Sequence, residues 1–433
     1  MIKKNSLHTV KITDINNLGF GICRIEGIVT FVQGGVTGDE AEIKIIKSAR
    51  DYCVARVEKL LSASPYRTDS LCPVSRTCGG CVYRHITYGH EKELKRSYVE
   101  NAFCKAGVSV EVAEVTSNDK TEGYRNKVQY PVGKDGVIGY YKPKTHDIIE
   151  CDNCILEEPM LYEIKKHIAD FIKDKRIDCL RHIYLRLGKA TGEVMVCLVS
   201  AKKKFAYLDE LCNTVCEKFP QVKCFALNLN DKDTNVILGK DTFILKGNPY
   251  IEDELLGCRF RISPQSFYQV NHDMTELLYS KVIEFCNLKE GQSFIDLYCG
   301  CGTIGLCVAS KAKTANMLGV EIIPQAVDNA KVNAGINGIE NAKFLCGDAS
   351  DAPLHKCDCV IVDPPRKGLT PKLIEQLSEA GVEKIVYVSC NPDTLARDCA
   401  LFIEKGYKLS TVYPYDLFPR TGHVENIVQL YRK

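Results

Sequence analysis

Two residues near the C-terminus could carry out covalent and acid–base chemistry. Cys390 follows the apolar run KIVYVS and precedes a helical pattern, and Glu425 leads the apolar run ENIVQLY. A thiolate is the strongest nucleophile among protein side chains, and a carboxylate at the start of an apolar strand can act as a general base. Each residue alone could instead be structural, as a buried strand-end cysteine or a solvated strand start. Together they predict a nucleophile and a base near a sheet edge.

Residues 296–363 indicate a nucleotide-cofactor site. The segment DLYCGCG (296–302) joins a predicted strand to a helix, and its glycines allow a sharp turn and close approach to a ligand. Glu321 closes the next predicted strand, where its carboxylate can accept hydrogen bonds from both ribose hydroxyls. Asp348 and Asp363 follow the next two strands. We therefore expect four polar groups, Asp296 included, to converge on one crevice.

The glycine loop alone does not identify the cofactor. The string GCGTIG (300–305) also matches a dinucleotide-binding loop. Asp296 argues against that reading, because its charge would repel a pyrophosphate and attract the ammonium group of an amino acid. S-adenosylmethionine carries such an ammonium group, so we expect it to be the cofactor. The alternative is an acidic strand end in a fold that binds no nucleotide.

A group of cysteines has the spacing of metal ligands. Cys72, Cys78 and Cys81 lie in the glycine-containing segment CPVSRTCGGCVY, and Cys151 and Cys154 follow later in the chain. Four thiolates suit zinc or an iron–sulfur cluster, and the sequence alone does not choose between the two. It also leaves open which of the two later cysteines is the fourth ligand. The triplet lacks the Cys-x3-Cys-x2-Cys spacing of radical enzymes, so we expect a structural role.

Composition narrows the class of protein. The chain has 433 residues, 45% of them hydrophobic, which is enough for two or three separate cores. Its 57 basic and 55 acidic residues leave a net charge of +2, which neither indicates nor excludes a nucleic-acid partner. The N-terminus MIKKNSLHTVKI has no apolar stretch of signal-peptide length, and no apolar run reaches the roughly 18 residues of a membrane span. We therefore expect a cytoplasmic protein with no membrane partner, whose 23 cysteines are mostly reduced and buried.

The hydropathy pattern divides the chain into three domains. Short alternating runs punctuated by glycines predict a small all-β barrel over residues 1–60. Residues 61–270 mix strands and helices and contain the cysteine group, which predicts an α+β central domain. From 271 to 433, apolar strands alternate with helices, which predicts a doubly wound, mainly parallel α/β sheet of Rossmann type.

These motifs resemble those of a known family, the RNA uracil-5 methyltransferases that use S-adenosylmethionine, and within it the branch that acts on 23S ribosomal RNA. The resemblance spans almost the whole chain, and its most specific segments occur in the family's order: SPQSFYQVN (263–271), DLYCGCGTIGL (296–306), DPPRKG (363–368), SCNP (389–392) and HVE (423–425). It implies a class I methyltransferase domain. The N-terminal part resembles the OB-like TRAM barrel, with Thr37 where relatives often have proline.

The resemblance implies a mechanism and a set of ligands. Cys390 would add to C6 of a flipped-out uracil, C5 would take the methyl group, and Glu425 would remove the C5 proton before Cys390 is eliminated. Phe267 would lie near the target base. The residues expected to bind the cofactor are Gln269, Tyr298, Glu321 and Asp363.

The resemblance also implies a [4Fe–4S] cluster and contacts with RNA. The expected cluster ligands are Cys72, Cys78, Cys81 and Cys154, with Cys151 as the competing fourth ligand. Arg125 and Lys127, in GYRNKVQY, match positions where relatives carry basic residues and are candidates for RNA contact.

The predicted function is therefore formation of 5-methyluridine in 23S rRNA. Arg366 stands after Asp-Pro-Pro where adenine-N6 methyltransferases place an aromatic residue, and cytosine-5 methyltransferases have another cysteine in this motif, so uracil ranks above cytosine and adenine. We expect a monomer with an RNA substrate and no DNA partner. One alternative is a tRNA uracil-5 methyltransferase, whose branch typically lacks the barrel and the cluster cysteines. The other is a non-catalytic RNA-binding assembly factor, against which the intact Cys390 and Glu425 argue.

Overall fold

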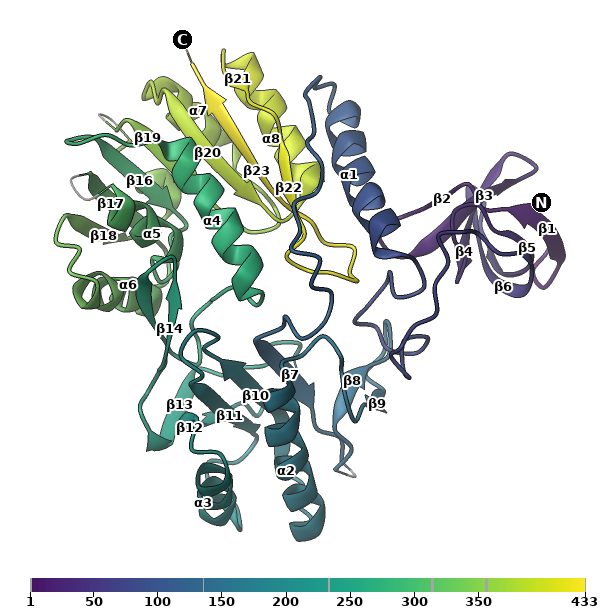
Figure 1. Ribbon diagram of the computed structural model, residues 1–433, viewed down its shortest axis with the longest axis horizontal. Coiled ribbons are helices and arrows are strands. Elements are labelled where there is room, and N and C mark those ends of the chain that lie inside the picture. Colours follow the sequence, from purple (N-terminus) through teal and green to yellow (C-terminus); the bar gives the residue numbers. More distant parts are fainter. Residues whose placement is uncertain (1, 135, 233, 313–314, 355–356, 433) are drawn as a thin grey trace.

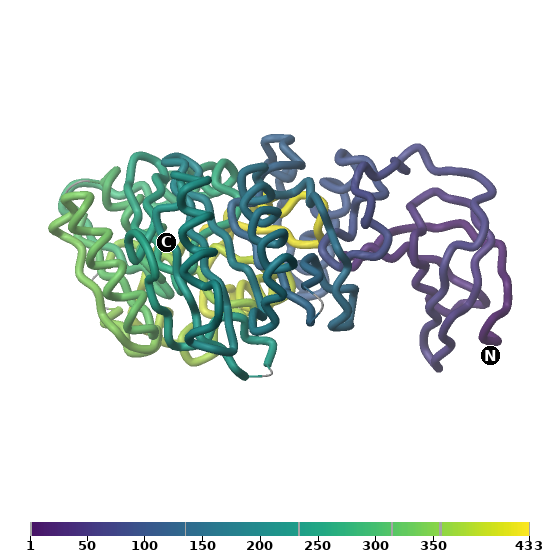
Figure 2. The backbone as a smooth tube through the Cα atoms, turned by 90° about the horizontal axis from the view of Figure 1, so that it is seen from below, coloured from purple at the N-terminus to yellow at the C-terminus, as the bar shows by residue number. Residues whose placement is uncertain are grey.

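The computed structural model describes residues 2–134, 136–232, 234–312, 315–354 and 357–432. Three sheets of five or more strands organise the chain (Figure 1). Figure 2 shows that the N-terminal sheet lies at one end of an elongated molecule, away from the other two. None of the helices in the described ranges has the length and apolar character needed to cross a membrane.

The N-terminal sheet has six strands in the order β1-β5-β6-β4-β3-β2, and only the β4–β6 pair is parallel. Alternating burial along these strands directs one face into a small apolar core that includes Cys23, Val32, Ile43 and Ile45. The last strand runs past residue 60. The strands are β1 (Leu7–Lys11), β2 (Asp14–Ile15), β3 (Phe20–Ile25), β4 (Ile28–Gln33), β5 (Glu40–Ser48) and β6 (Tyr52–Ser62).

The middle sheet has five strands in the order β13-β12-β11-β10-β7, mostly antiparallel. Two helices, α2 (Pro159–Lys175) and α3 (Leu208–Lys218), pack on one face, where Cys212 is buried as its helical spacing predicts. A hairpin of β8 and β9 lies beside this sheet. The strands are β7 (Lys127–Pro131), β8 (Gly139–Tyr141), β9 (Ile148–Glu150), β10 (Leu180–Leu187), β11 (Val194–Ser200), β12 (Val222–Leu229) and β13 (Asp241–Gly247).

The C-terminal sheet has eight strands in the order β18-β17-β16-β19-β20-β23-β21, with β22 also paired to β23. Strands β16 to β20 are parallel, and β23 pairs antiparallel with β20. The strands are β16 (Ser293–Leu297), β17 (Asn316–Glu321), β18 (Ala342–Cys346), β19 (Cys359–Val362), β20 (Lys384–Ser389), β21 (Lys408–Leu409), β22 (Tyr413–Tyr415) and β23 (Glu425–Tyr431).

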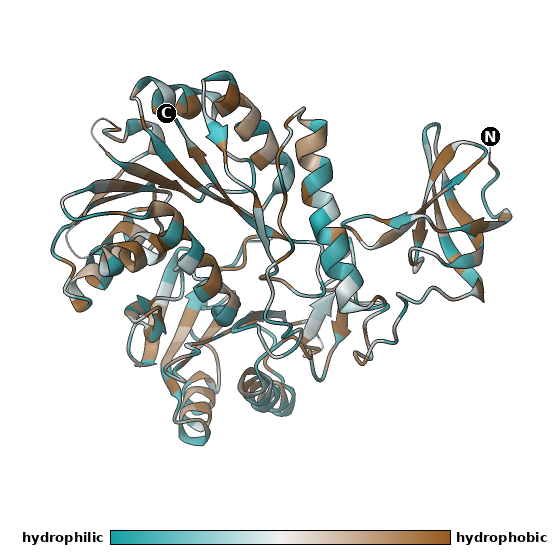
Figure 3. Ribbon diagram, turned by 45° about the horizontal axis from the view of Figure 1, so that its top comes forward, coloured by the Kyte–Doolittle hydropathy of each residue, from teal (hydrophilic) through white to brown (hydrophobic). Residues whose placement is uncertain are grey.

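Helices cover both faces of this sheet, as its continuous apolar strands require. Successive residues of β19 and β20 alternate between two apolar clusters, one on each face. Figure 3 shows the strands as predominantly hydrophobic between helices whose outer sides are hydrophilic. On one face lie α4 (His272–Cys286), α5 (Thr303–Lys311) and α6 (Pro324–Ile336), and on the other lie α1 (Tyr88–Lys105), α7 (Pro371–Glu379) and α8 (Pro392–Glu404). A short 3-10 turn, η1 (Ala349–Asp351), follows β18.

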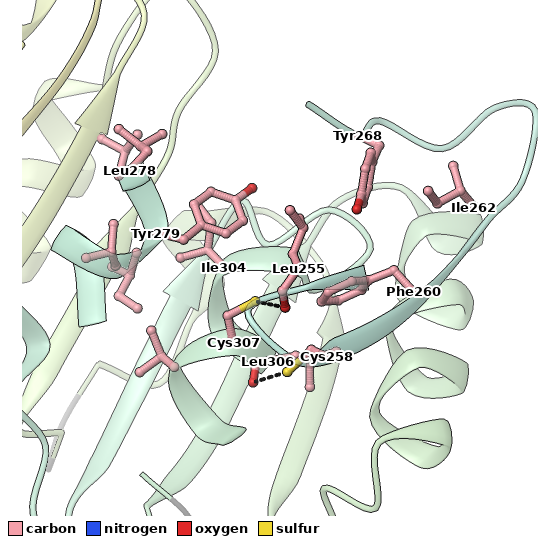
Figure 4. Close-up of a cluster of buried hydrophobic side chains, with 14 of the residues drawn as sticks. Leu255, Cys258, Phe260, Ile262, Tyr268, Leu278, Tyr279, Ile304, Leu306 and Cys307 are labelled. Atoms are coloured by element: carbon pink, nitrogen blue, oxygen red, sulfur yellow. Dashed lines mark hydrogen bonds between the residues drawn. The ribbon is translucent and has the colours of Figure 1, made fainter. Parts of the chain in front are cut away.

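The hairpin of β14 (Ile251–Leu255) and β15 (Cys258–Ile262) joins the middle and C-terminal sheets through one continuous core. Figure 4 shows its side chains packed against α4 and α5. The Cys307 thiol donates to the Leu255 carbonyl at 3.6 Å, and the Cys258 thiol donates to the Leu306 carbonyl at 3.8 Å. These cysteines therefore serve as buried packing residues with weak hydrogen bonds.

Helix α1 lies within the expected central domain in sequence but packs against the C-terminal sheet beside α8 (Figure 1). Its Lys95 ammonium group is buried and donates to Glu91 at 2.8 Å and to Asp416 at 2.7 Å, both carboxylates being fully buried. The apolar pattern of the helix did not indicate which sheet it covers. The buried Lys95 and its two carboxylate partners hold α1 beside the C-terminal sheet, because each of these charges would be costly to bury alone.

We predict that Lys95→Met lowers the free energy of unfolding by about 3–5 kcal/mol, because two buried carboxylates lose their partner. The neighbouring Arg96 forms a 3.0 Å ion pair with Glu100 on the exposed side of the same helix. Arg96→Met should therefore cost less than about 1 kcal/mol. Urea denaturation of both variants measures the difference, and equal losses would contradict the burial argument.

Candidate active site

A cavity of about 950 Å³ lies at the carboxyl ends of the parallel strands and is bordered by the middle sheet and the cysteine-rich loop. Its size is within the range of small-molecule sites. The catalytic, cofactor and base-contacting residues implied by the family resemblance line it: Phe267, Gln269, Tyr298, Glu321, Asp363, Cys390 and Glu425. The structure therefore brings together side chains that are up to 158 positions apart in the sequence, from 267 to 425.

Strand pairing places the predicted nucleophile and base opposite each other. The antiparallel ladder of β20 and β23 ends with Ser389 paired to Asn426, and Cys390 and Glu425 are the next positions on the two strands. Directly opposed residues in such a pair have Cβ atoms about 5 Å apart. Asp363 immediately follows β19, whose last residue is in register with Tyr387 of β20. Three reactive groups thus lie at neighbouring strand ends.

Local hydrogen bonds hold Cys390 at the start of α8. The Asn391 side chain caps the helix by accepting from the Asp393 amide at 3.1 Å, and Pro392 occupies its first turn. The Asn391 amide side chain also donates to the Arg366 carbonyl at 3.0 Å. This contact ties the nucleophile segment to the DPPR segment, so the two motifs form one surface.

The site gathers three acidic groups in a buried environment. Burial, with smaller contributions from the charges of Glu425 and Asp363, raises the pKa of the Cys390 thiol to about 11, and Arg366 opposes that shift. Burial and the charge of Asp363 raise the pKa of Glu425 to about 8, and burial raises the pKa of Asp363 to about 7. At neutral pH the thiol is therefore protonated, and a cation bound in the cavity would favour the ionised forms of all three groups.

The glycine loop orients Glu321. The Gly300 amide donates to one oxygen of this carboxylate at 3.1 Å, and the Ile323 amide donates to the other at 2.9 Å. Tyr298 turns the chain with a positive φ of 64°, and Gly302 continues with φ of 84°. A side chain at Gly302 would collide with Leu306, so glycine is required there.

Of the four polar residues expected to converge at the strand ends, Asp296 and Asp348 do not line the cavity. Asp296 is buried beneath α5, where it accepts from the Gly305 amide at 2.9 Å, and burial raises its pKa to about 8. Asp348 is exposed and caps η1 by accepting from the Ser350 amide. Contrary to expectation, Asp296 thus does not line the cavity, since a strand-end carboxylate can bind the following helix instead.

Three side chains donate hydrogen bonds to the backbone carbonyls of residues 266, 267 and 269 and so hold the segment that carries Phe267 and Gln269. The Arg186 guanidinium donates to the Ser266 carbonyl at 3.0 Å, the Cys301 thiol donates to the Phe267 carbonyl at 3.4 Å, and the Asn126 side chain donates to the Gln269 carbonyl at 3.2 Å. The Phe267 ring is nevertheless 67% exposed. An exposed aromatic face held rigidly at the rim of a cavity is suited to stacking on a base.

The cysteine group lines the same cavity, with contributions from Cys72, Cys78, Cys81, Cys151 and Cys154. Burial is the main cause of the raised pKa values of Cys78 and Cys81, and the charge of Cys154 contributes to both. Within the described ranges, however, no group of three or more Cys, His, Asp or Glu side chains is arranged to hold a metal ion. The thiols are gathered, but the structure does not show the predicted metal centre.

Sequence analysis missed several residues of the cavity wall. Arg84 and Phe418 line it, as do Ile322 and Ile323, which are 63% and 57% exposed. The two isoleucines directly after Glu321 could have indicated this part of the cavity wall, because exposed apolar residues that lie together often mark a ligand surface. Arg125 and Lys127, predicted as RNA contacts, also line the cavity, and burial with nearby positive charge lowers the pKa of Lys127 to about 8.

Comparisons with known proteins cover the whole chain. The family model described as tRNA (Uracil-5-)-methyltransferase matches residues 87–433, and the TRAM domain model matches residues 3–57. A Clostridium tetani protein named "Uncharacterized RNA methyltransferase" is 38% identical over 446 residues, covering 99% of this chain and 96% of that protein. A Bacillus cereus protein of the same name is 38% identical over 452 residues, covering 100% and 98%.

One similar solved structure is the crystal structure of the Pyrococcus abyssi tRNA (uracil-54, C5)-methyltransferase in complex with S-adenosyl-L-homocysteine. Its TM-score is 0.80 and its sequence identity is 29%, and the match covers 98% of this chain and 99% of that one. The likeness therefore includes the N-terminal sheet as well as the other two.

We predict that Glu425→Gln speeds alkylation of Cys390 by iodoacetamide at pH 9 by about threefold, the effect of roughly half a pKa unit. At that pH Glu425 is mostly ionised, so removing its charge lowers the pKa of the thiol. Arg366→Gln should slow the reaction, because it removes an opposing charge. Peptide mass spectrometry measures the rate, with the exposed Cys104 as internal reference. Shifts of the same sign in both variants would contradict the electrostatic coupling.

Proposed function

We propose a function on the premise that this chain belongs to the tRNA (uracil-5-)-methyltransferase family and is therefore an S-adenosylmethionine-dependent RNA methyltransferase. The proposed reaction forms 5-methyluridine in 23S ribosomal RNA. The family and fold class expected from the sequence, with a TRAM all-β domain ahead of a methyltransferase fold, are confirmed. The observation that carries the proposal is the placement of Cys390 opposite Glu425 in the cavity that also holds the expected cofactor residues.

The proposed reaction begins with Cys390. Its thiolate forms a bond to C6 of the uracil, and the electron pair of the C5–C6 double bond moves onto the C4 carbonyl as an enolate. S-adenosylmethionine supplies an electrophilic methyl group on a positively charged sulfur. C5 of the enolate would form the new carbon–carbon bond to that methyl group, whose bond to sulfur breaks as the electron pair returns to sulfur and S-adenosylhomocysteine leaves. Glu425 then takes the C5 proton, the C5–C6 double bond re-forms, and the Cys390 thiolate leaves.

The charge distribution supports these roles. The Cys390 thiol is protonated in the free protein because burial raises its pKa, so its proton must leave before attack. The positive sulfonium and Arg366 both favour the thiolate. With a pKa of about 8, Glu425 is a stronger base than an ordinary glutamate once it is ionised, and the positive sulfonium favours that ionised form. In the cofactor site we assign Glu321 to the ribose, with Gln269, Tyr298 and Asp363 as its neighbours in the cavity.

The rim of the cavity is suited to a single-stranded RNA with one base turned inward. Phe267 offers an aromatic face, and Arg84, Arg125, Lys127 and Arg366 provide positive charge around it. The TRAM domain would extend the contact along the phosphate backbone. We propose that the protein acts as a cytoplasmic monomer.

A tRNA substrate is the second candidate. The Pyrococcus abyssi protein is described as a tRNA enzyme, and it aligns over nearly all of this chain, the N-terminal sheet included. The barrel therefore does not separate the two substrates, contrary to expectation. What favours ribosomal RNA is the set of cysteines at the cavity wall, which resembles that of the ribosomal-RNA branch.

For those cysteines we propose a structural [4Fe–4S] cluster held by Cys72, Cys78, Cys81 and Cys154. The support is their position along one side of a shared cavity together with the family resemblance. A cluster there would fasten the 72–81 loop to the segment after β9. It would shape the RNA-facing wall and take no part in the reaction above.

We predict that RNA containing 5-fluorouridine forms a stable covalent adduct with the protein in the presence of S-adenosylmethionine, because fluorine at C5 cannot be removed as a proton. Cys390→Ala should form none. Glu425→Gln should form an adduct even on ordinary RNA, because the last step is blocked. Denaturing gels with labelled RNA measure the product. An adduct retained in Cys390→Ala would exclude this residue as the nucleophile.

The same gel distinguishes the two candidate substrates. Matched transcripts of 23S rRNA and tRNA, each with 5-fluorouridine, are offered separately. Adduct on the ribosomal transcript alone supports the first proposal, and adduct on tRNA alone replaces it with the second. Adduct on neither, at any protein concentration, would contradict both.

We predict that protein purified without oxygen contains about four iron and four sulfide ions per chain, as a [4Fe–4S] cluster requires. Cys78→Ser should lose most of both. Cys104→Ser, at an exposed cysteine outside the group, is the matched control and should lose neither. Stoichiometric zinc, or iron unaffected by Cys78→Ser, would refute the cluster.

A further inference from the structure

The segment 416–424, between β22 and β23, forms one wall of the active-site cavity and leads directly into Glu425. Phe418, Thr421 and His423 of this segment line the cavity. It contains no helix or strand. Glu425 itself is paired with Tyr415 of β22, so the conformation of the chain that leads into it, from 416 to 424, depends on contacts from outside the segment.

One side of the segment is held by α1. The carboxylate of Asp416 accepts from Lys95 at 2.7 Å and from the Tyr88 hydroxyl at 2.8 Å. Lys95 also donates to the Phe418 carbonyl at 3.2 Å, and the Arg420 amide donates to Glu91 at 2.6 Å. These buried bonds fix the first half of the segment.

The other side is held by residues 82–83, which in turn contact the N-terminal barrel. The Arg420 carbonyl accepts from the amides of Val82 and Tyr83 at 2.9 and 3.2 Å, and the Tyr83 hydroxyl donates to the Asn16 carbonyl at 3.0 Å. Asn16 begins the turn between β2 and β3. The barrel turn is thus bonded to the catalytic segment through residues 82–83.

Two glycines show how closely these parts approach. A Cβ atom added to Gly422 would lie 1.7 Å from the backbone oxygen of Asn17, and one added to Gly19 would lie 2.4 Å from the backbone oxygen of Val82. Such distances leave no room for any side chain. The barrel turn lies directly on the segment, only three positions before Glu425.

The contact is also secured by an apolar core. Ile15 and Val36 of the barrel pack with Tyr83, Ile86 and Leu94, and all five are buried. Because Leu94 belongs to α1, the barrel, the 82–86 segment and α1 share this cluster. Burial of this kind indicates a fixed interface between the barrel and the enzyme body.

We propose that the barrel turn Asn16–Gly19 is a positioning element of the active site, which presses segment 416–424 into the conformation that Glu425 needs for removal of the C5 proton. The inference rests on the proposed function. It gives the barrel a role in a chemical step, in addition to any contact with RNA. Glu425 remains the catalytic residue, and the barrel acts through it.

Full-length Gly422→Ala and Gly19→Ala test this from both sides of the contact. Gly335→Ala is the control for the first, because Gly335 has no atom within 4 Å of an added Cβ. Gly27→Ala is the control for the second, because Gly27 lies in the same barrel with φ of 81°, close to the 78° of Gly19, but has open space around it. Tyr83→Phe removes the hydrogen bond to Asn16 with little change in shape.

We expect Gly422→Ala and Gly19→Ala to lower kcat at least tenfold with less than twofold change in the KM for RNA. Both should accumulate covalent adduct on ordinary RNA, as Glu425→Gln does, because elimination waits for proton removal. Tyr83→Phe should show the same effect more weakly. In Gly422→Ala, alkylation of Cys390 at pH 9 should also become faster, because the Glu425 charge has moved away.

Three results would overturn the inference: kcat values equal to those of the control variants, a change in KM alone, or a loss of kcat without adduct. If Gly422→Ala does not fold, the pair Gly19→Ala and Gly27→Ala decides. Wild-type protein that forms no adduct on either RNA contradicts the proposed function itself. In that case the alkylation rate of Cys390 still tests the contact, and an unchanged rate in Gly422→Ala overturns it.

Discussion

The antiparallel pairing of β20 with β23, next to the parallel strands β16 to β20, is the constraint on which the active site depends. A parallel neighbour would bring the carboxyl end of a second strand to this edge, whereas β23 brings its first residue. Glu425 therefore meets Cys390 across the last step of the ladder. The proposed nucleophile follows the end of β20 and the proposed base is the first residue of β23, so each lies where a regular strand meets an irregular segment.

That arrangement explains why so much of the molecule gathers around the segment before β23. Buried charges from α1 hold its beginning, and the barrel turn covers its end. The ion pairs of Lys95 add specificity of position more than net stability, since burial of each charge offsets much of the attraction. The same contacts join elements that the sequence places more than three hundred positions apart, namely Lys95 and Asp416.

Charge is the second organising feature. Cys390, Glu425 and Asp363 share the cavity, and burial raises the pKa of each, which favours its neutral form. A site of this kind favours a cationic ligand, and S-adenosylmethionine carries its positive sulfur next to the group being transferred. Arg366 is the cation of the cavity wall that opposes these shifts in both Cys390 and Glu425. The electrostatics of the site and the chemistry of the family's methyl donor therefore agree.

The sequence by itself determined the alternation of strands and helices and the strand-end positions of Glu321, Asp363, Cys390 and Glu425, because local patterns encode which residues end strands of a parallel sheet. It could not tell that Asp296 turns beneath α5 or that Asp348 caps a turn, since a strand-end carboxylate has the same local pattern whether it binds a ligand or a helix. Only the tertiary structure decided that α1 covers the C-terminal sheet and that Gly422 lies against the barrel. Those contacts join distant segments, and packing between distant surfaces leaves no periodic trace in either one.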